Sequence, residues 1–461
     1  MSKVALLNLN QYEHPYPVYP VGLAYLHGAL HRAGHTCCYW ERAEGLDALV
    51  GLLTGEKPDV VGISIRNIDN VQSHHPISLI GELQSLAQLI RKHCSASLIL
   101  GGSGFSIFPE ELMRRSGADY GICGEGEQGL TALIGALEGA GPLPVISGLC
   151  TVRDGVFHRE PMLPSDVLSL DIPKHFDKVL PRYLEQGSLP GVQTQRGCAF
   201  RCCYCTYPLI EGRKLRRFSG DQVADEMLQL KSLGARYAFI VDSVFNTNPE
   251  HVEELCEVLI RRDVGISWSC FLRPTKVTEA TLKLMQRAGL KHVEFGTDSL
   301  SDPVLEAYGK HFTYAEVETA SKLANKLGLH YSHFLILGGP GETSETLAET
   351  LARAKQLPGA IYFATLGMRV YPDTPLAAIE GAQPRNGTEA TSLLEPPCFY
   401  RSPQLPTGAL DEAMATIQRD EANWIVGDPS PAFKTISTKL RRRGVVGPMW
   451  EYIELLQRIN R

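Results

Sequence analysis

The sequence of 461 residues contains no long apolar run and no block of one charge. No apolar stretch approaches the roughly 20 residues needed to span a bilayer, and the first ten residues lack the apolar core and cleavage site of a signal peptide. The 45 basic and 51 acidic residues are mixed along the chain and leave a formal net charge of −6. No basic stripe could follow a phosphate backbone. We therefore expect neither a membrane span nor a nucleic-acid partner.

The sequence also lacks the cysteine pattern of a disulfide framework, although it contains twelve cysteines. Four of them fall within residues 196–208, where Cys198, Cys202 and Cys205 have the spacing C-x3-C-x2-C. Three thiolates this close cannot all pair as disulfides, but a tight loop can turn them toward one soft metal centre. A [4Fe–4S] cube would keep one iron free of protein ligands, whereas zinc requires a fourth ligand. The pattern favours the cube over zinc or mere packing of cysteines, and such a cluster predicts a reducing, cytoplasmic location.

At these residues the chain resembles the radical S-adenosylmethionine (SAM) superfamily, whose signature is C-x3-C-x2-C with an aromatic residue before the last cysteine, here Tyr204. The resemblance implies that Cys198, Cys202 and Cys205 bind a [4Fe–4S] cluster and that Tyr204 lies against the cofactors. SAM would chelate the open iron and be cleaved to a 5'-deoxyadenosyl radical. The electron would come from an external donor of the flavodoxin or ferredoxin type.

The N-terminal third alternates short apolar runs with segments of helical spacing, at residues 3–8, 21–33, 60–65, 77–92, 98–100, 109–115 and 120–123. Such alternation predicts a parallel, doubly wound α/β sheet whose ligands lie beyond the carboxyl ends of the strands. There is no G-x-G-x-x-G after the first strand, so a dinucleotide is a poor candidate ligand.

Three loops at the expected strand ends, together with the runs PVGLAYLHGALHRAGH and GADYGICGEGE, resemble the cobalamin-binding domain that precedes the radical SAM domain in one large subclass. The resemblance implies cobalamin contacts from Arg66, Asn67, Asp69, Gly101, Gly102, Ser103, Gly104, Gly124, Glu125 and Gly126. The D-x-H-x-x-G motif that supplies a histidine ligand to cobalt is absent. By position, Arg66 or Asn67 would lie under the cobalt; alternatively, Arg66 forms an ion pair with Asp69 or Glu125.

The central region repeats the strand–helix pattern six times, which matches the partial (β/α)6 barrel of radical SAM enzymes. We predict a cobalamin-binding domain at 1–147, a proline-interrupted linker at 148–189, the barrel at 190–376 and a helical, substrate-capping region at 377–461. The family pattern implies SAM-binding or site roles for polar groups at strand ends: Asp242, Ser269, Arg273, Glu294, Asp298, Gly338, Gly339 and Arg369. In the tail, Phe399, Tyr400 and Arg401 are candidate substrate contacts, and the basic run 441–443 is expected to be a solvated surface.

These features predict a cobalamin-dependent radical SAM enzyme, and within that class a methyltransferase. It would transfer a methyl group from SAM through cobalamin to an unactivated carbon or phosphorus of a small metabolite, such as a natural-product or lipid precursor. If Arg66 leaves cobalt five- or four-coordinate, a variant is a polar methyl transfer to a nucleophilic carbon, with Tyr308 as base and without cleavage of SAM to a radical. The alternatives are oxidation, cyclisation, ring contraction or transfer of another SAM fragment on the same fold, and a non-catalytic cobalamin or iron–sulfur sensor.

Overall fold

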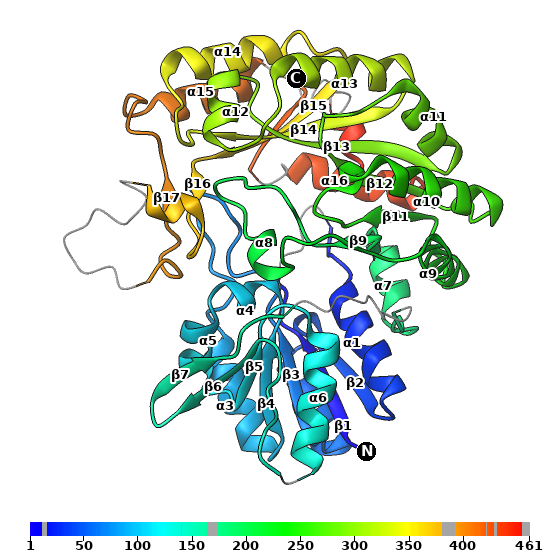
Figure 1. The fold of residues 1–461 in the computed structure, drawn as a ribbon, viewed down its shortest axis with the longest axis vertical. Helices are drawn as coiled ribbons and strands as arrows, with labels where there is room; N and C mark the ends of the chain where they lie inside the picture. Colours follow the sequence, from blue (N-terminus) through cyan, green and yellow to red (C-terminus); the bar gives the residue numbers. More distant parts are fainter. Residues whose placement is uncertain are drawn as a thin grey trace.

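The protein consists of two seven-stranded sheets, one above the other, with a small C-terminal region beside the second (Figure 1). The computed structural model describes residues 1–11, 16–139, 141–163, 173–379, 392–420, 422–427 and 431–453. Within these residues no helix is long and apolar enough to cross a membrane. The predicted α/β fold class, with a doubly wound domain followed by a barrel-type parallel sheet, is confirmed.

The first sheet has the strand order β2-β1-β3-β4-β5-β6-β7 and is parallel from β2 to β5. Helices α1 and α6 pack together, as do α2, α3 and α5, so both faces are covered. The bounds are β1 Lys3–Asn8, α1 Val21–Arg32, β2 Thr36–Glu41, η1 Arg42–Glu44, α2 Leu46–Glu56, β3 Val60–Ser64, α3 Leu83–His93, β4 Ser97–Gly101, α4 Ser103–Ile107, α5 Pro109–Ser116, β5 Tyr120–Ile122, α6 Gly126–Glu138, β6 Leu149–Arg153 and β7 Val156–Arg159.

Two parts of this sheet were not expected from the sequence. β2 is an edge strand whose side chains are mostly half-buried, so it lacks the continuous apolar run of its neighbours. The antiparallel hairpin β6–β7 lies in the segment predicted as linker, yet it extends the first sheet through β5.

The second sheet is parallel throughout, with the order β18-β15-β14-β13-β12-β11-β8. Because β8 and β18 do not pair with each other, the barrel remains open along one side. The bounds of its strands and helices are β8 Gly191–Val192, α9 Gly220–Ser232, β11 Tyr237–Ile240, η2 Phe245–Thr247, α10 Pro249–Arg261, β12 Ser267–Leu272, α11 Glu279–Arg287, β13 Leu290–Asp298, α12 Asp302–Ala307, α13 Tyr314–Lys326, β14 His330–Leu337, α14 Ser344–Ala354, β15 Ala360–Leu366 and β18 Trp424–Val426.

The C-terminal region completes the barrel instead of only covering it. The sequence predicts a helical region at 377–461, but this region also contains β18, which pairs in parallel with β15. Its helices are α15, Ala409–Asp420, and α16, Pro431–Arg442, followed by the short η4, Trp450–Tyr452. Ile361, Ile425, Phe433, Met449 and Trp450 form one apolar cluster that holds this region on β15 and β18.

Short elements connect and flank the two sheets. They are α7 Leu180–Glu185, β9 Gln195–Arg196, α8 Tyr207–Ile210, β10 Arg216–Arg217, β16 Met368–Arg369, η3 Pro375–Ala378 and β17 Phe399–Tyr400. Helix α8, directly after the cysteine motif, contacts α4 of the first domain. The cysteine loop and the carboxyl edge of the first sheet therefore meet at the domain interface.

Candidate functional site

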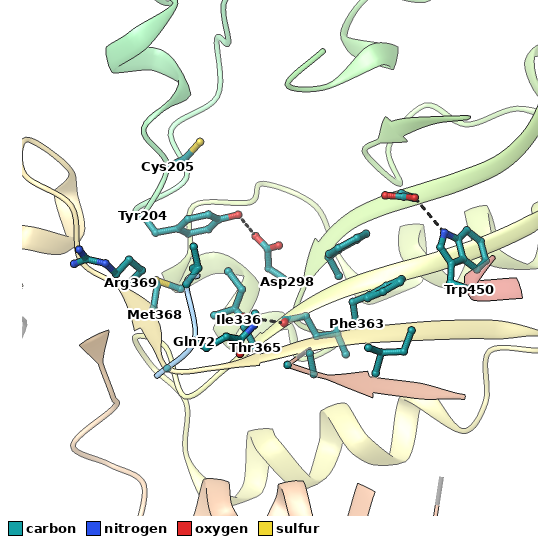
Figure 2. Close-up of a pocket in the computed structure, with 18 of the residues that line it drawn as sticks. Gln72, Tyr204, Cys205, Asp298, Ile336, Phe363, Thr365, Met368, Arg369 and Trp450 are labelled. Carbon is teal, nitrogen blue, oxygen red and sulfur yellow. Dashed lines mark hydrogen bonds between the residues drawn. The ribbon is translucent and has the colours of Figure 1, made fainter. Parts of the chain in front are cut away.

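A cavity of about 540 Å³ lies where the two domains and the C-terminal region meet (Figure 2). This volume is within the range of small-molecule sites. The first domain contributes Tyr16, Val71 and Gln72, and the cysteine loop contributes Tyr204 and Cys205. Strands β13 to β15 and the C-terminal region supply most of the remaining wall, including Glu294, Asp298, Phe334, Ile336, Phe363, Thr365, Met368, Arg369, Tyr371, Ile425, Phe433 and Trp450.

The cysteine loop begins with a glycine that no other residue could replace without strain. Gly197 has a φ of +92°, and a side chain there would collide with the carbonyl of Lys214. The amide of Cys198 donates to the Gly212 carbonyl at 3.0 Å, and that of Cys205 donates to the Cys202 carbonyl at 3.2 Å. These bonds fold residues 198–205 into the tight loop that the spacing predicted.

The three motif cysteines fit an iron–sulfur cube better than a single metal ion. Burial, together with the nearby Cys202 and Cys198, raises the pKa of the Cys205 thiol to about 12. The thiols are thus within electrostatic reach of one another, but no three His, Cys, Asp or Glu side chains among the described residues could hold one ion. In a cube each cysteine binds a different iron, so its sulfurs stand farther apart than around zinc.

Cys203, which lies inside the motif, is turned away from this loop. It packs with Val304, Tyr308, Met368 and Tyr400 in a small apolar cluster, and its sulfur lies 3.9 Å from that of Met368. Cys203 therefore lies in a different environment from the three motif cysteines.

Buried charged groups surround the cysteine loop on the barrel side. Lys310 Nζ and the Tyr204 hydroxyl both donate to Asp298 Oδ2, at 2.6 and 2.5 Å. The Arg273 guanidinium lies 3.7 Å from the centre of the Phe200 ring and donates to the Lys310 carbonyl. Arg273 and Asp298 were predicted from the sequence, whereas Lys310 was not, because an isolated lysine in a loop has no pattern that distinguishes it.

Several predicted SAM contacts have partners within the chain. Asp242 accepts hydrogen bonds from the amides of Thr194 and Gln195 at 2.7 and 3.2 Å and from the Thr194 hydroxyl at 2.5 Å, so it ties β11 to the start of the cysteine segment. Ser269 is buried on β12 and is not part of the cavity wall. In the turn after β14, the Gly338 amide donates to the Glu342 carboxylate.

Tyr308 is the predicted residue whose position differs most from its expected role. It is fully buried, its hydroxyl donates to the Ile336 carbonyl at 2.9 Å, and it accepts from the Gly339 amide at 3.0 Å. Burial raises its pKa well above the usual value. Tyr308 is not part of the cavity wall and holds the glycine turn in place, a geometry that argues against a base that meets substrate.

The glycine loop after β4 supports the loop after β3. Gly102 has a φ of +100°, and a side chain there would overlap the backbone of Ile65. The Ser103 hydroxyl donates to the Arg66 carbonyl at 2.9 Å, and the Ile65 amide donates to the Gly101 carbonyl at 2.8 Å. With Gly104, which also packs on residues 65–66, this loop fixes the backbone that carries Arg66 and Asn67.

Arg66 forms no ion pair with any residue that the structure describes. Its side chain keeps accessible surface, yet the surrounding chain encloses it and lowers its pKa, an effect that Tyr207 and Tyr16 oppose. Neither predicted partner is available among the described residues, since Asp69 and Glu125 pair with other arginines. Arg66 is thus a cation with accessible surface at the start of loop 66–72. Its position at the edge of the first sheet fits a large ligand such as cobalamin.

Asp69, a predicted cofactor contact, instead joins the two domains. Its Oδ2 accepts from Arg369 Nε at 2.9 Å, and both side chains are about 2% exposed. Arg369 also donates to the carbonyls of Val370 and Cys398, at 2.7 and 3.2 Å, and borders the cavity.

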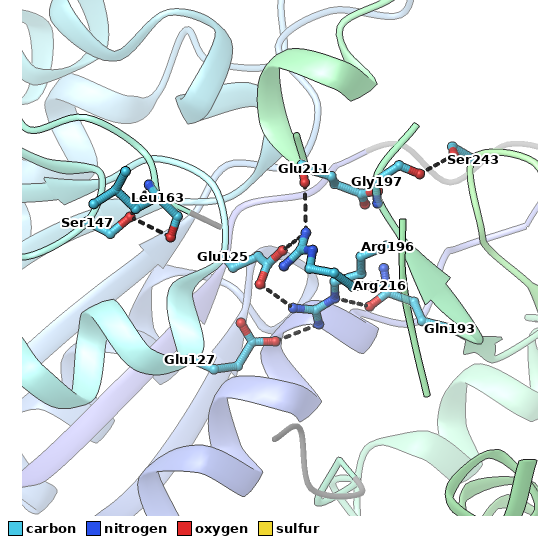
Figure 3. Close-up of polar contacts among 10 residues, drawn as sticks. All are labelled: Glu125, Glu127, Ser147, Leu163, Gln193, Arg196, Gly197, Glu211, Arg216 and Ser243. Carbon is cyan, nitrogen blue, oxygen red and sulfur yellow. Dashed lines mark hydrogen bonds and ion pairs between the residues drawn. The ribbon is translucent and has the colours of Figure 1, made fainter. Parts of the chain in front are cut away.

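Glu125 likewise contributes to an interdomain contact (Figure 3). Glu125 pairs with Arg216 and, at 3.4 Å, with Arg196, whereas Glu127 accepts from Arg196 at 2.7 Å. Gly126 packs closely on Leu26, and Gly124 on Met162. Arg196 directly precedes the cysteine loop, so this cluster positions that loop on the first domain.

The C-terminal residues expected to contact substrate are not the ones that reach the cavity. Phe399 pairs with Arg369 in the β16–β17 ribbon, Tyr400 is buried and Arg401 lies 3.3 Å from the Ser73 hydroxyl. Ile425, Phe433 and Trp450 line the cavity instead. Nor is the basic run simply a solvated surface, because Arg441 lies 5.5 Å from the centre of the Tyr16 ring and donates to the Gln186 carbonyl.

Two family models match the chain in the regions described above. Residues 192–354 match the radical SAM superfamily, and residues 13–134 match the B12 binding domain. The chain is therefore a radical SAM enzyme with an N-terminal B12-binding domain. Its cofactors are a [4Fe–4S] cluster, SAM and cobalamin, which confirms the resemblance drawn from the sequence.

The relatives are mainly methyltransferases. The chain is 26% identical, over 81% of its length, to tryptophan 2-C-methyltransferase of Streptomyces laurentii, of which it covers 74%. It is 28% identical, over 73% of its length, to an uncharacterized methyltransferase of Pyrococcus horikoshii, of which it covers 73%. The fold is that of the radical SAM methyltransferase TsrM from Kitasatospora setae, solved with cobalamin and a [4Fe–4S] cluster bound, with a TM-score of 0.88 at 24% identity and coverage of 99% of this chain and 98% of that one. Anaerobic magnesium-protoporphyrin IX monomethyl ester cyclases are also similar.

Proposed function

We propose that this enzyme is a methyltransferase that moves a methyl group from SAM, with cobalamin as carrier, to an unactivated carbon or phosphorus of a small metabolite. The observation that carries the proposal is the single cavity shared by the cysteine loop, the loop after β3 and the barrel strands. A substrate in this cavity would lie between the SAM-binding side and the cobalamin-binding side. The relatives that act as methyltransferases support the same reaction type.

The residues of the cysteine loop and of the first domain have distinct roles in this proposal. Cys198, Cys202 and Cys205 would hold the cluster, with Lys310 and Arg273 supplying positive charge beside it. Arg66 and Asn67 would lie against cobalamin on the backbone fixed by Gly102 and Ser103. The cofactors supply a one-electron centre and a methyl carrier, and the chain supplies position and exclusion of water.

The cavity wall favours a flat, largely apolar substrate. Tyr16, Phe334, Phe363, Phe433 and Trp450 are aromatic, and Phe334 and Phe363 lie parallel with ring centres 4.7 Å apart. Aromatic walls bury a large apolar area at low conformational cost. L-Tryptophan, the compound named for one relative, is therefore a suitable first acceptor to test.

The test uses enzyme reconstituted anaerobically with iron, sulfide and cobalamin, supplied with trideuteriomethyl-SAM, a low-potential reductant and L-tryptophan or a panel of aromatic metabolites. We expect product that carries one trideuteriomethyl group, formed by the native chain and not by Cys205→Ala. A ferredoxin or flavodoxin should replace the chemical reductant. A modified but unlabelled product would contradict methyl transfer and favour the oxidative or cyclising chemistry suggested by the cyclase relatives.

A further inference from the structure

The cavity wall contains a second acidic side chain, Glu294, on the part of β13 that lies away from the cysteine loop. Glu294 lies four residues before Asp298 on β13, but the strand has a register shift between them. Their partners on β14, Ser332 and Leu335, are three residues apart, so the two positions lie about 10 Å apart along the sheet. Glu294 Oε1 accepts a hydrogen bond from Trp450 Nε1 at 3.2 Å, drawn as a dashed line in Figure 2. Its Oε2 accepts no hydrogen bond from any residue that the structure describes.

The C-terminal region forms part of the cavity wall beside Glu294. The Trp450 ring packs edge-on against His292, with ring centres 5.2 Å apart, and against Phe363 at 6.5 Å. The next residue, Glu451, pairs with His292 and His330 at 3.1 and 3.0 Å. Trp450 is thereby fixed in a position that gives Glu294 one donor and leaves its second oxygen to the cavity.

No cation within the described chain compensates Glu294. Its titration is influenced by burial, which raises the pKa of the carboxyl to about 7, and by the Trp450 hydrogen bond, which lowers it. The titratable groups whose pKa the Glu294 charge raises are the hydroxyls of Tyr16 and Tyr237 and the thiol of Cys270. Arg441 and Arg66 act on Tyr16 and not on the carboxyl, and His292 is engaged by Tyr237 and Glu451.

An acid of this kind is suited to a cationic ligand. A buried carboxylate without a counter-ion is costly, and an ammonium group that donates to Oε2 would offset that cost. The aromatic faces around it, from Trp450, Phe363 and Tyr16, would also favour a cation. A carboxylate or phosphate in the same place would be repelled.

We propose that Glu294 binds a protonated amino group of the substrate and thus orients an amine-bearing molecule with its opposite end toward Cys205 and Tyr204. The proposal deepens the methyltransferase function and rests on it for the identity of the bound molecule as substrate. The substrate class is a primary amine with an apolar or aromatic body, short enough to fit between the two polar ends of the cavity.

Equilibrium binding to the cofactor-loaded enzyme tests this site without turnover. The probes are tryptamine, phenethylamine and hexylamine, each compared with the carboxylate of matching body: indole-3-propionate, 3-phenylpropionate and heptanoate. We expect at least one amine to bind more tightly than its carboxylate and to lose at least tenfold in affinity in Glu294→Gln, which keeps the acceptor for Trp450. Affinity of the native enzyme should rise as pH increases from 6 to 8, because the carboxylate forms through a pKa of about 7.

Glu226→Gln is the matched control. Glu226 is also buried and also has a raised pKa, about 8, but it bonds Tyr25 outside the cavity, so its replacement should leave amine affinity unchanged. Both variants should retain cobalamin and the native circular dichroism spectrum. If no amine shows binding that depends on Glu294, the proposal is overturned. Because turnover is not needed, retained amine binding without labelled methyl product would contradict the proposed reaction only.

Discussion

The two polar ends of the cavity differ in how completely the chain satisfies them. Near the cysteine loop, Asp298 accepts from both Lys310 and Tyr204, and Arg273 donates to the Lys310 carbonyl. At the other end, Glu294 has one donor, Trp450, and no counter-ion among the described residues. Polar groups that the chain pairs with one another mainly hold structure, whereas a buried polar group without a partner stores free energy that a ligand can release.

The same contrast separates the arginines at the domain interface. Arg196 and Arg369 are buried and paired with Glu127 and Asp69, whereas Arg66 is accessible and unpaired among the described residues. Removing a paired group should therefore cost stability, and removing an unpaired one should cost binding. The four substitutions below, each compared with a control or contrast variant, are ordered from the largest expected effect to the smallest.

The largest effect is expected from the cysteine loop. Cys205→Ala should abolish the absorbance of a reconstituted [4Fe–4S] cluster and all SAM cleavage, since each motif thiol holds one iron. Cys203→Ala is the matched control, because that side chain packs against Tyr308 and Met368. Its iron content should match that of the native chain. A Cys203 variant that loses iron while the Cys205 variant keeps it would reverse the ligand assignment.

Removing the ion pair between Lys310 and Asp298, near the cysteine loop, should destabilise the fold. Lys310→Met leaves the buried Asp298 carboxylate with only the Tyr204 hydroxyl, and we expect a loss of about 3–5 kcal/mol in unfolding free energy by urea denaturation. Lys326→Met removes an exposed pair with Glu279 and should cost about 0–1 kcal/mol. Equal losses in the two variants would show that burial of the Lys310 pair does not matter.

Removing the Glu294 carboxyl should have the opposite effect above neutral pH and increase the free energy of unfolding. The folded pKa of Glu294, about 7, lies above its ordinary value of 4.5, so the stability that this carboxyl contributes is present below pH 4.5 and lost as pH rises through 7. Glu294→Gln should therefore match the native protein near pH 5. At pH 8 it should be more stable, by up to roughly 3 kcal/mol.

Urea midpoints at the two pH values measure this difference. Glu254→Gln, at an exposed position on α10, is the control and should show no pH-dependent gain. A Glu294→Gln variant that is less stable than the native chain at pH 8 would mean that the carboxylate is paired within the protein.

The smallest effect on stability is expected at Arg66. Arg66→Met should change the unfolding free energy of the apo protein by no more than about 0.5 kcal/mol, because it removes no ion pair. The same variant should alter cobalamin affinity and the visible spectrum of the bound cofactor. Arg196→Met provides the contrast, with an expected loss of about 3–5 kcal/mol from the stranded Glu127. Similar losses in both variants would make Arg66 a structural residue.

Much of the fold could be predicted because buried parallel strands are short apolar runs with helices between them. β1 begins and ends where the sequence predicts, whereas β2 and β18 were not predicted. β2 is a half-buried edge strand. β18 spans only Trp424–Val426, too short for a pattern, and it forms because β15 presents an open edge.

By itself, the sequence determined the cysteine loop, the order of the two α/β domains and the cofactors they imply, because ligand spacing and hydrophobic periodicity act over a few residues. Only the tertiary structure decided which polar residues pair within the chain and which remain available to bind a ligand. Asp69 meets an arginine 300 positions away, Glu127 meets one 69 positions away, and Trp450 donates a hydrogen bond to Glu294 across 156 positions. Such pairs arise from chain segments that pack together, and no local pattern encodes which carboxylate will find a partner and which will be left for a ligand.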